Sequence, residues 1–202
     1  MLKGIDMSLF NIFDKCPKIE TERLILRHMK VTDARDMYDY AHRPEVTKYL
    51  LWAPHDGLEY TRSYLKQVER CYRQGTFHDF GVILKENNRF IGTCGFARID
   101  KANSTAEAGY VLNPDYWGRG LATEALSAVI ALGFEKRGFN RIESKYMVNN
   151  LASRRVMEKS GMTFEGVLRQ SIFVKDGYED IGVCAILKQD YRSVNGVKFT
   201  NI

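Results

Sequence analysis

Two glycines stand where a strand is expected to give way to the longest helical pattern of the chain. This segment reads Tyr110-Val111-Leu112-Asn113-Pro114-Asp115-Tyr116-Trp117-Gly118-Arg119-Gly120-Leu121-Ala122-Thr123-Glu124-Ala125. Gly118 and Gly120 lack Cβ atoms, so a ligand can approach the backbone closely. A helix start also offers unpaired N–H groups and the positive end of a dipole, and Arg119 adds a positive charge. The segment therefore predicts an anion cradle suited to a phosphate or a pyrophosphate.

Two common phosphate-binding loops do not fit this segment. No Lys follows Gly120, which excludes the G-x-x-x-x-G-K-[ST] loop. The dinucleotide fingerprint G-x-G-x-x-G requires a third glycine, and Thr123 stands at that position. On these residues alone, a plain tight turn before a helix stays open as the alternative to a phosphate site.

The elements that would position the turn follow from hydrophobic periodicity. An apolar stripe at helical spacing runs over 118–136. Alternating residues and turn signals predict strands over 23–27, 80–84, 89–99, 106–112, 140–148, 162–173 and 181–187. Further helices are predicted over about 32–41, 58–73 and 152–159. This order predicts one mixed α/β (α+β) domain in three layers, with helices on the faces of a sheet. We expect a lead-in over 1–19, the domain over 20–190 and a tail over 191–202.

Composition limits the classes of function. The chain has 202 residues, 45% of them hydrophobic and 27% charged, with a net charge of +5. It can bury a sizeable core, and the mild basic balance suits anionic ligands without choosing among them. No basic face with interleaved aromatic residues is evident, so nucleic acid is not an expected partner.

Cysteine spacing and hydropathy bear on location. The four cysteines, Cys16, Cys71, Cys94 and Cys184, form no C-x-x-C pair, so we expect reduced thiols and no metal site. No apolar run approaches the roughly 20 residues of a membrane-spanning helix, and the first residues do not read as a signal peptide. We therefore expect a cytoplasmic protein without a membrane partner.

Three motifs resemble one enzyme family. The stretch Trp117-Gly118-Arg119-Gly120-Leu121-Ala122 resembles the acyl-CoA-binding motif of the Gcn5-related N-acetyltransferases (GNAT), [Gln/Arg]-x-x-G-x-[Gly/Ala]. Its first position departs from that pattern, but Trp is usual there in the branch of ribosomal-protein N-terminal acetyltransferases. The stretch 150–162 is similar to the family's N-x-x-S-x-x-v-x-x-K-x-G-F, with Met162 in place of Phe. The segments 165–169 and 176–180 are similar to the closing hairpin of that branch.

The resemblance, which covers about 20–187, implies acetyl transfer from acetyl-CoA to an amine on a mostly antiparallel, twisted sheet of about seven strands. It implies that main-chain amides of the turn hold the cofactor's pyrophosphate: Gly118, Arg119, Gly120, Ala122 and Thr123. Trp117 and Leu121 are also expected among the cofactor-binding residues. The pantetheine arm would run along 106–112, at Tyr110, Val111 and Leu112, where the strand at 140–148 splays away. A bulge near 110–112 would free an N–H for the thioester oxygen.

The resemblance also suggests catalytic residues, each with a plainer alternative. Glu107 is the candidate base, or else a carboxylate in a sheet-edge salt bridge, with His55 and His78 as other candidates. Many family members carry a Tyr acid where Met157 stands, and the branch uses a Ser hydroxyl near the sulfur, which Ser153 matches. Asn150 is expected to bind the arm or the substrate. Both Asn150 and Ser153 could instead cap a helix.

The expected function is acetyl-CoA-dependent N-acetylation of a primary amine, most favourably a protein N-terminal α-amine, such as that of a ribosomal protein. An α-amine has a pKa near 7.7–8.0, against about 10.4 for Lys, so a weak base suffices. The alternatives are a small amine as acceptor, or an acyl-CoA sensor without catalysis. Segments 43–57, 77–80 and 173–178 would select the acceptor. The oligomeric state, including a homodimer, stays open.

Overall fold

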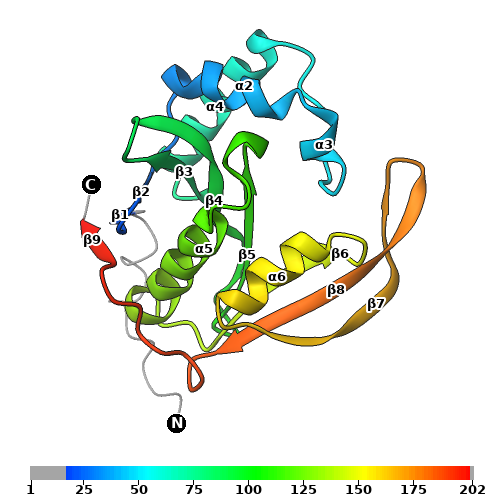
Figure 1. Cartoon of the computed structure of the whole chain (residues 1–202). Coiled ribbons are helices and arrows are strands. Elements are labelled where there is room, and N and C mark those ends of the chain that lie inside the picture. Colours follow the sequence, from blue (N-terminus) through cyan, green and yellow to red (C-terminus); the bar gives the residue numbers. More distant parts are fainter. Residues whose placement is uncertain (1–16, 201–202) are drawn as a thin grey trace.

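One open, twisted sheet positions every other element (Figure 1). The computed structural model describes residues 17–200, so Cys16 and most of the expected lead-in lie outside the described residues. Within that range the sheet order is β7-β8-β6-β5-β4-β3-β2-β1-β9. The strands are β1 (Lys18–Glu20), β2 (Leu24–Arg27), β3 (His78–Leu84), β4 (Arg89–Asp100), β5 (Thr105–Leu112), β6 (Arg141–Met147), β7 (Thr163–Val174), β8 (Gly177–Leu187) and β9 (Lys198–Thr200). Only the β5–β6 pairing is parallel among these strands.

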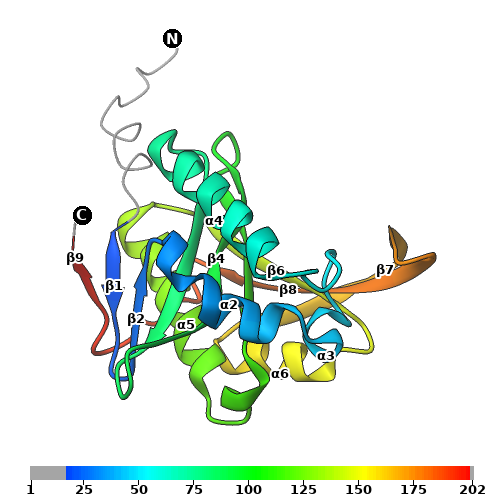
Figure 2. The same ribbon diagram turned by 90° about the horizontal axis from the view of Figure 1, so that it is seen from above.

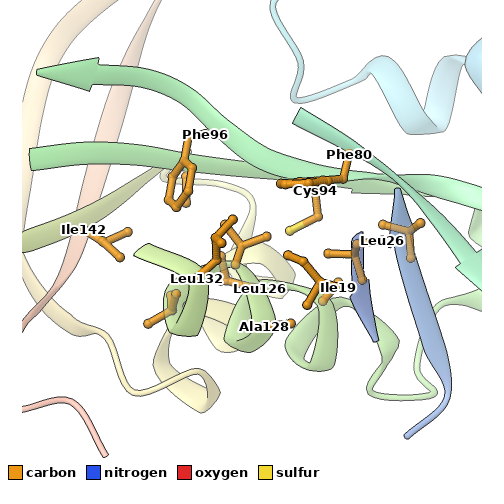
Figure 3. Close-up of a cluster of buried hydrophobic side chains, with 14 of the residues drawn as sticks. Ile19, Leu26, Phe80, Cys94, Phe96, Leu126, Ala128, Leu132 and Ile142 are labelled. Atoms are coloured by element: carbon orange, nitrogen blue, oxygen red, sulfur yellow. The ribbon is translucent and has the colours of Figure 1, made fainter. Parts of the chain in front are cut away.

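Helices cover both faces of the sheet (Figures 1 and 2). They are η1 (Val31–Asp33), α2 (Ala34–Ala41), α3 (Pro44–Thr47), α4 (Leu58–Arg73), η2 (Pro114–Tyr116), α5 (Leu121–Ala131), the π-helical η3 (Leu132–Lys136) and α6 (Leu151–Lys159). The larger core cluster joins α5 to one face of the sheet, where Leu126 packs with Phe80 and Ile142 (Figure 3). The smaller cluster joins α2 and α4 to the other face through Met37, Leu65 and other apolar side chains. The expected three-layer α/β domain is confirmed.

The sheet has nine strands rather than the expected seven. Both additional strands, β1 and β9, are three residues long, too short to show alternation in a sequence. Ile19 of β1 pairs with Leu26 on one side and with Phe199 of β9 on the other. The segment expected as a tail therefore returns to the sheet, where Phe199 packs against the larger core cluster.

The helix expected over 118–136 begins later, at Leu121. Gly118 and Gly120 have φ angles of 74° and 76°, in the left-handed region. That conformation cannot continue a right-handed helix, and glycine adopts it without the steric cost that a side chain brings. The two glycines thus form a separate turn directly before α5.

The pairing of β5 with β6 stops early. It covers Thr105↔Arg141, Ala106↔Ile142 and Glu107↔Glu143, whereas β5 continues to Leu112 and β6 to Met147. The expected splaying of these strands is confirmed. The expected bulge near 110–112 is wrong, because β5 and β4 keep one register from Gly92↔Leu112 to Phe96↔Ala108, and the shift lies at Ala97 of β4. The open edge of β5 arises from the parting of the strands, not from a bulge.

The packing of β9 gives a stability prediction. Replacing Phe199 by Ala removes a partly buried ring from the larger core cluster, so we expect the free energy of unfolding to fall by about 1–2 kcal/mol. Urea unfolding followed by circular dichroism measures this change. The exposed neighbour Thr200, replaced by Ala, serves as the control and should stay within about 0.5 kcal/mol. Equal midpoints for Phe199→Ala and the unsubstituted chain would show that β9 does not stabilise the sheet.

Candidate functional site

The glycine turn presents its main chain to solvent at the start of α5. Gly118, Arg119 and Gly120 are exposed, and a Cβ added at Gly118 would have nothing within 4 Å. The first helical hydrogen bond runs from the Glu124 N–H to the Gly120 carbonyl at 3.1 Å. The amides of Leu121, Ala122 and Thr123 lie before that bond, where a helix provides no acceptor. This arrangement fits the cradle for a pyrophosphate that the sequence predicts.

Two side chains from the segment before β2 hold this turn in place. The Thr21 hydroxyl donates to Glu124 at 2.6 Å, and the Arg23 N–H and Nε donate to the same carboxylate at 2.8 and 2.6 Å. Arg23 Nη1 also donates to the Arg119 carbonyl at 2.9 Å. Burial raises the pKa of Glu124, but these hydrogen bonds outweigh it and leave the pKa lowered. The carboxylate therefore stays ionised and anchors the first turn of α5.

The Arg119 side chain is engaged outside the turn. Its guanidinium contacts Glu86 at 3.1 Å and lies over the Tyr116 ring. This ion pair is exposed and therefore weak, so an arriving phosphate could compete with Glu86 for the side chain. The indole N–H of Trp117 turns the other way and donates to the Leu112 carbonyl at 2.8 Å, closing the end of β5.

The main chain of Tyr110 faces the gap between β5 and β6. The Asn113 N–H donates to Ile91 of β4, so by alternation the main-chain groups of Leu112, Tyr110 and Ala108 face the other way, toward β6. The Leu112 carbonyl accepts a hydrogen bond from the Trp117 indole, and the Ala108 carbonyl accepts one from the Ser144 hydroxyl at 2.6 Å. Tyr110 lies between them, beyond the last β5–β6 pair. An extended chain could therefore bind at Tyr110 as an added strand.

The Tyr110 side chain meets Ser153 of α6. Its hydroxyl lies 2.9 Å from the Ser153 carbonyl and 2.8 Å from the Ser153 Oγ. Burial raises the pKa of Tyr110 above its usual value, so the phenol is protonated. The Asn150 side chain accepts from the Ser153 N–H at 3.1 Å and caps α6, which is the plainer role that the sequence left open. Met157 is buried in the larger core cluster and has no proton to donate.

Glu107 lies at the last β5–β6 pair, and its carboxylate forms a salt bridge. Lys145 contacts it at 2.7 Å and contacts Glu143 at 3.2 Å. Burial lowers the pKa of Lys145, but its bonds to the two carboxylates outweigh this and raise it. The salt bridge that was the alternative to a base is therefore present. Its position, where the strands part, still places Glu107 beside the gap.

The two histidine candidates lie in packed surroundings. His55 Nδ1 is 2.8 Å from the Thr61 hydroxyl, and the ring contacts those of Trp52, Tyr60 and Tyr64. His78 begins β3. Burial lowers the pKa of both histidines, so they are neutral at neutral pH.

Two segments expected to select the acceptor meet across the molecule. The β7–β8 hairpin projects from the sheet toward α3 (Figures 1 and 2), and Lys175 in its turn donates to the Thr47 carbonyl of α3. Phe173 and Tyr178 of this hairpin are exposed and stack edge to face.

Sequence reasoning missed one carboxyl. Asp79 of β3 pairs with Gly95 of β4, and burial raises its pKa from 3.8 to about 7, although hydrogen bonds from Thr93 and Phe80 oppose this. An acidic residue directly before the apolar run 80–84 was the available signal.

Features of other site types are not evident between residues 17 and 200. No group of three His, Cys, Asp or Glu side chains there is arranged to hold a metal ion, and Cys71, Cys94 and Cys184 are free thiols. None of the helices in this part of the chain is long and apolar enough to cross a membrane.

Comparison with known proteins identifies the family. Residues 23–163 match the model of the acetyltransferase (GNAT) domain. The uncharacterized N-acetyltransferase p20 of Bacillus licheniformis is 36% identical over 85% of this chain and 96% of its own length. The ribosomal-protein-serine acetyltransferase of Escherichia coli is 36% identical over 52% of this chain and 58% of its own.

A solved structure agrees with the family match. A GNAT-family acetyltransferase from Bacillus anthracis has a TM-score of 0.76 at 30% identity and covers 85% of this chain and 99% of its own. The exposed glycine turn, the open edge of β5 and these matches lead to one conclusion: the chain belongs to the GNAT family and is an acetyl-CoA-dependent N-acetyltransferase.

Proposed function

We propose that this enzyme acetylates the α-amine of a protein N-terminus. The observation that carries the acyl-transfer part is that the pairing of β5 with β6 ends at Glu107↔Glu143. The rest of β5, which leads to the glycine turn, therefore has an open edge. The choice of an α-amine rests on chemistry and on the similarity to the ribosomal-protein-serine acetyltransferase.

The acyl donor would be held by main-chain groups. The amides of the turn and of the first residues of α5 would bind its pyrophosphate, namely Gly118, Arg119, Gly120, Leu121, Ala122 and Thr123, whereas the Trp117 N–H already donates to the Pro114 carbonyl at 3.0 Å. The main chain of Tyr110 would bind its pantetheine arm as an added strand, with Val111 and Leu112 flanking that contact. Acetyl-CoA supplies an acetyl thioester, whose carbonyl carbon the acceptor amine attacks. A donor held by glycine amides needs no charged side chain in the cradle.

Two hydroxyl groups would protonate the departing sulfur. Tyr110 and Ser153 share a hydrogen bond of 2.8 Å at the edge of the gap, and Tyr110 keeps its proton because burial raises its pKa. A thiol has a pKa near 8.5 and leaves readily, so this pair needs to give only modest help. Asn150 supports Ser153 by capping α6, and Glu107 stays a candidate for receiving the amine proton.

Amine basicity favours the N-terminal acceptor. Near neutral pH a substantial fraction of an α-amine (pKa about 7.7–8.0) is uncharged, whereas a Lys side chain (pKa about 10.4) is almost fully charged. A small amine is the second candidate acceptor, favoured by the aromatic cluster around His55. A sensor without catalysis is the third, favoured by the absence of a proton donor at Met157.

An acceptor screen separates these functions. Thiol release from acetyl-CoA is measured with peptides that have a free N-terminus, the same peptides with a blocked N-terminus and an internal Lys, polyamines and aminoglycosides, and mass spectrometry locates the acetyl group. We expect the peptides with a free N-terminus to react fastest. Faster transfer to a small amine contradicts the proposal, and binding of acetyl-CoA without turnover on any acceptor indicates a sensor.

The cradle can be tested by binding alone. We expect Gly120→Glu to abolish acetyl-CoA binding in calorimetry, because the substitution adds a side chain and a negative charge among the amides. The control is Gly196→Glu, since Gly196 has a similar left-handed φ of 83° and open space at its Cβ position. Unchanged affinity in the Gly120 variant, or equal loss in both, would place the pyrophosphate elsewhere.

The hydroxyl pair gives a kinetic prediction. We expect Ser153→Ala and Tyr110→Phe each to lower kcat by roughly 10- to 100-fold, at the low end of general acid catalysis because the thiol leaves readily. Acetyl-CoA affinity should change much less than kcat. Ser160→Ala is the control, because this hydroxyl directly after α6 donates only to main-chain carbonyls. Equal losses of affinity and turnover in the Ser153 variant would reduce that residue to a structural role.

A further inference from the structure

One aspartate and two glycines lie side by side on three neighbouring strands, on the face of the sheet that α2 and α4 cover; we call this row the strip. Asp79 of β3 pairs with Gly95 of β4, which pairs with Gly109 of β5. A Cβ added at Gly95 would lie 2.8 Å from Asp79 Oδ1, so the carboxyl group lies over this glycine. A Cβ added at Gly109 would meet nothing within 4 Å. The strip therefore has a carboxyl at one end and open space at the other.

The open end of the strip reaches the acyl-transfer site. Gly109 immediately precedes Tyr110, whose main chain faces the β5–β6 gap. Neighbouring strands are about 4.8 Å apart, so roughly 10 Å separates the backbones of Asp79 and Gly109. The Asp79 side chain and one or two water molecules can span that distance.

Aromatic side chains of α4 lie beside the carboxyl. The Tyr64 and Tyr60 rings, 38% and 57% exposed, both contact the His55 ring. Burial raises the pKa of Tyr64, and the negative charge of Asp79 raises it further. A carboxylate with aromatic faces beside it suits an incoming ammonium group. The Tyr72 hydroxyl donates to the Asp79 carbonyl at 2.7 Å and fixes this end of β3 against α4.

The titratable groups facing Asp79 all stay neutral. They are Tyr64 of α4 and Tyr40 of α2, and burial raises the pKa of each, whereas Cys94 of β4 belongs to the core on the α5 face. Burial likewise raises the pKa of Asp79 to about 7. That value is within about one unit of an α-amine and roughly three units below a Lys side chain. Proton transfer from an α-amine to this carboxylate is therefore nearly balanced, as efficient general base catalysis requires.

We propose that Asp79 is the proton acceptor for the attacking amine, acting through water along the Gly95–Gly109 strip. The inference rests on the proposed acetyl transfer to an amine. The amine nitrogen forms a bond to the thioester carbonyl carbon, and the carbon–sulfur bond breaks. The amine proton passes through water to the Asp79 carboxylate, and the sulfur leaves with the bonding pair and takes a proton from the Tyr110–Ser153 hydroxyls. Asp79 then releases its proton to solvent, and the hydroxyl pair regains one from solvent. Glu107 is less suited, because Lys145 holds its charge.

The main test compares Asp79→Asn with the unsubstituted chain on the best acceptor of the screen. We expect kcat/KM near pH 7 to fall at least about 100-fold, and the fall to shrink as the pH rises and the amine loses its proton unaided. Acetyl-CoA affinity in calorimetry should stay within about twofold. Asp190→Asn, an exposed carboxyl after β8, is the control and should change neither quantity. Asp79→Glu should recover part of the rate.

Stability provides a readout that does not depend on turnover. Because folding raises the pKa of Asp79 from 3.8 to about 7, the folded chain holds this proton more tightly, and stability falls as the pH rises through that window. The neutral amide of Asp79→Asn removes this loss and keeps an acceptor for the Phe80 N–H, which donates to Asp79 Oδ1 at 3.0 Å. We therefore expect Asp79→Asn to resist urea better than the unsubstituted chain by a larger margin at about pH 8 than at pH 5, while it loses activity.

The outcomes separate the two proposals. An unsubstituted enzyme that transfers acetyl to no amine overturns both the function and the role of Asp79. An active enzyme whose Asp79→Asn variant keeps kcat/KM within threefold, while Glu107→Gln loses it, overturns only the role of Asp79. Gly109→Val tests the strip itself. Its branched side chain enters open space, so the variant should fold and be as stable as the Asp190→Asn control. We expect it to raise KM for the acceptor.

Discussion

The β5–β6 ladder ends after three residue pairs, and the rest of the site depends on that ending. Antiparallel neighbours hold β5 on its other side in continuous register up to Leu112, so the strand stays extended although its partner leaves. An extended strand without a partner presents unpaired main-chain groups, which in a soluble fold attract another extended chain. The open edge at Tyr110 is thus a consequence of topology, and the side chains around it only block its two ends.

The anion cradle is a second main-chain device, and side chains fix its place. Gly118 and Gly120 take a left-handed conformation before α5, and the Glu124 carboxylate ties the helix start to Thr21 and Arg23. Because the cradle and the open edge both offer backbone groups, they suit the part of an acyl donor that does not vary with the acceptor, as proposed above. Side chains are left to choose the acceptor, which agrees with the aromatic and acidic residues on the α2 and α4 face.

The order of elements and the glycine turn could be predicted, because periodicity and glycine placement are local signals. The strands β1 and β9 could not, since three residues show no alternation and Phe199 finds Ile19 only through the fold. The site followed the same division. Gly120 was a candidate from glycine placement and Ser153 from the family resemblance, whereas the Lys145 partner of Glu107 and the approach of Tyr110 to Ser153 depend on the tertiary fold. Asp79 was missed because its significance comes from two glycines on neighbouring strands.

Amide hydrogen exchange with and without acetyl-CoA tests the central claim most directly, because the claim concerns main-chain N–H groups. On binding, protection should rise in peptides that cover 110–112 and 118–123 and stay unchanged in β1, β2 and β9. Protection confined to other segments, or none at saturating acetyl-CoA, would contradict the account of how this fold holds its acyl donor.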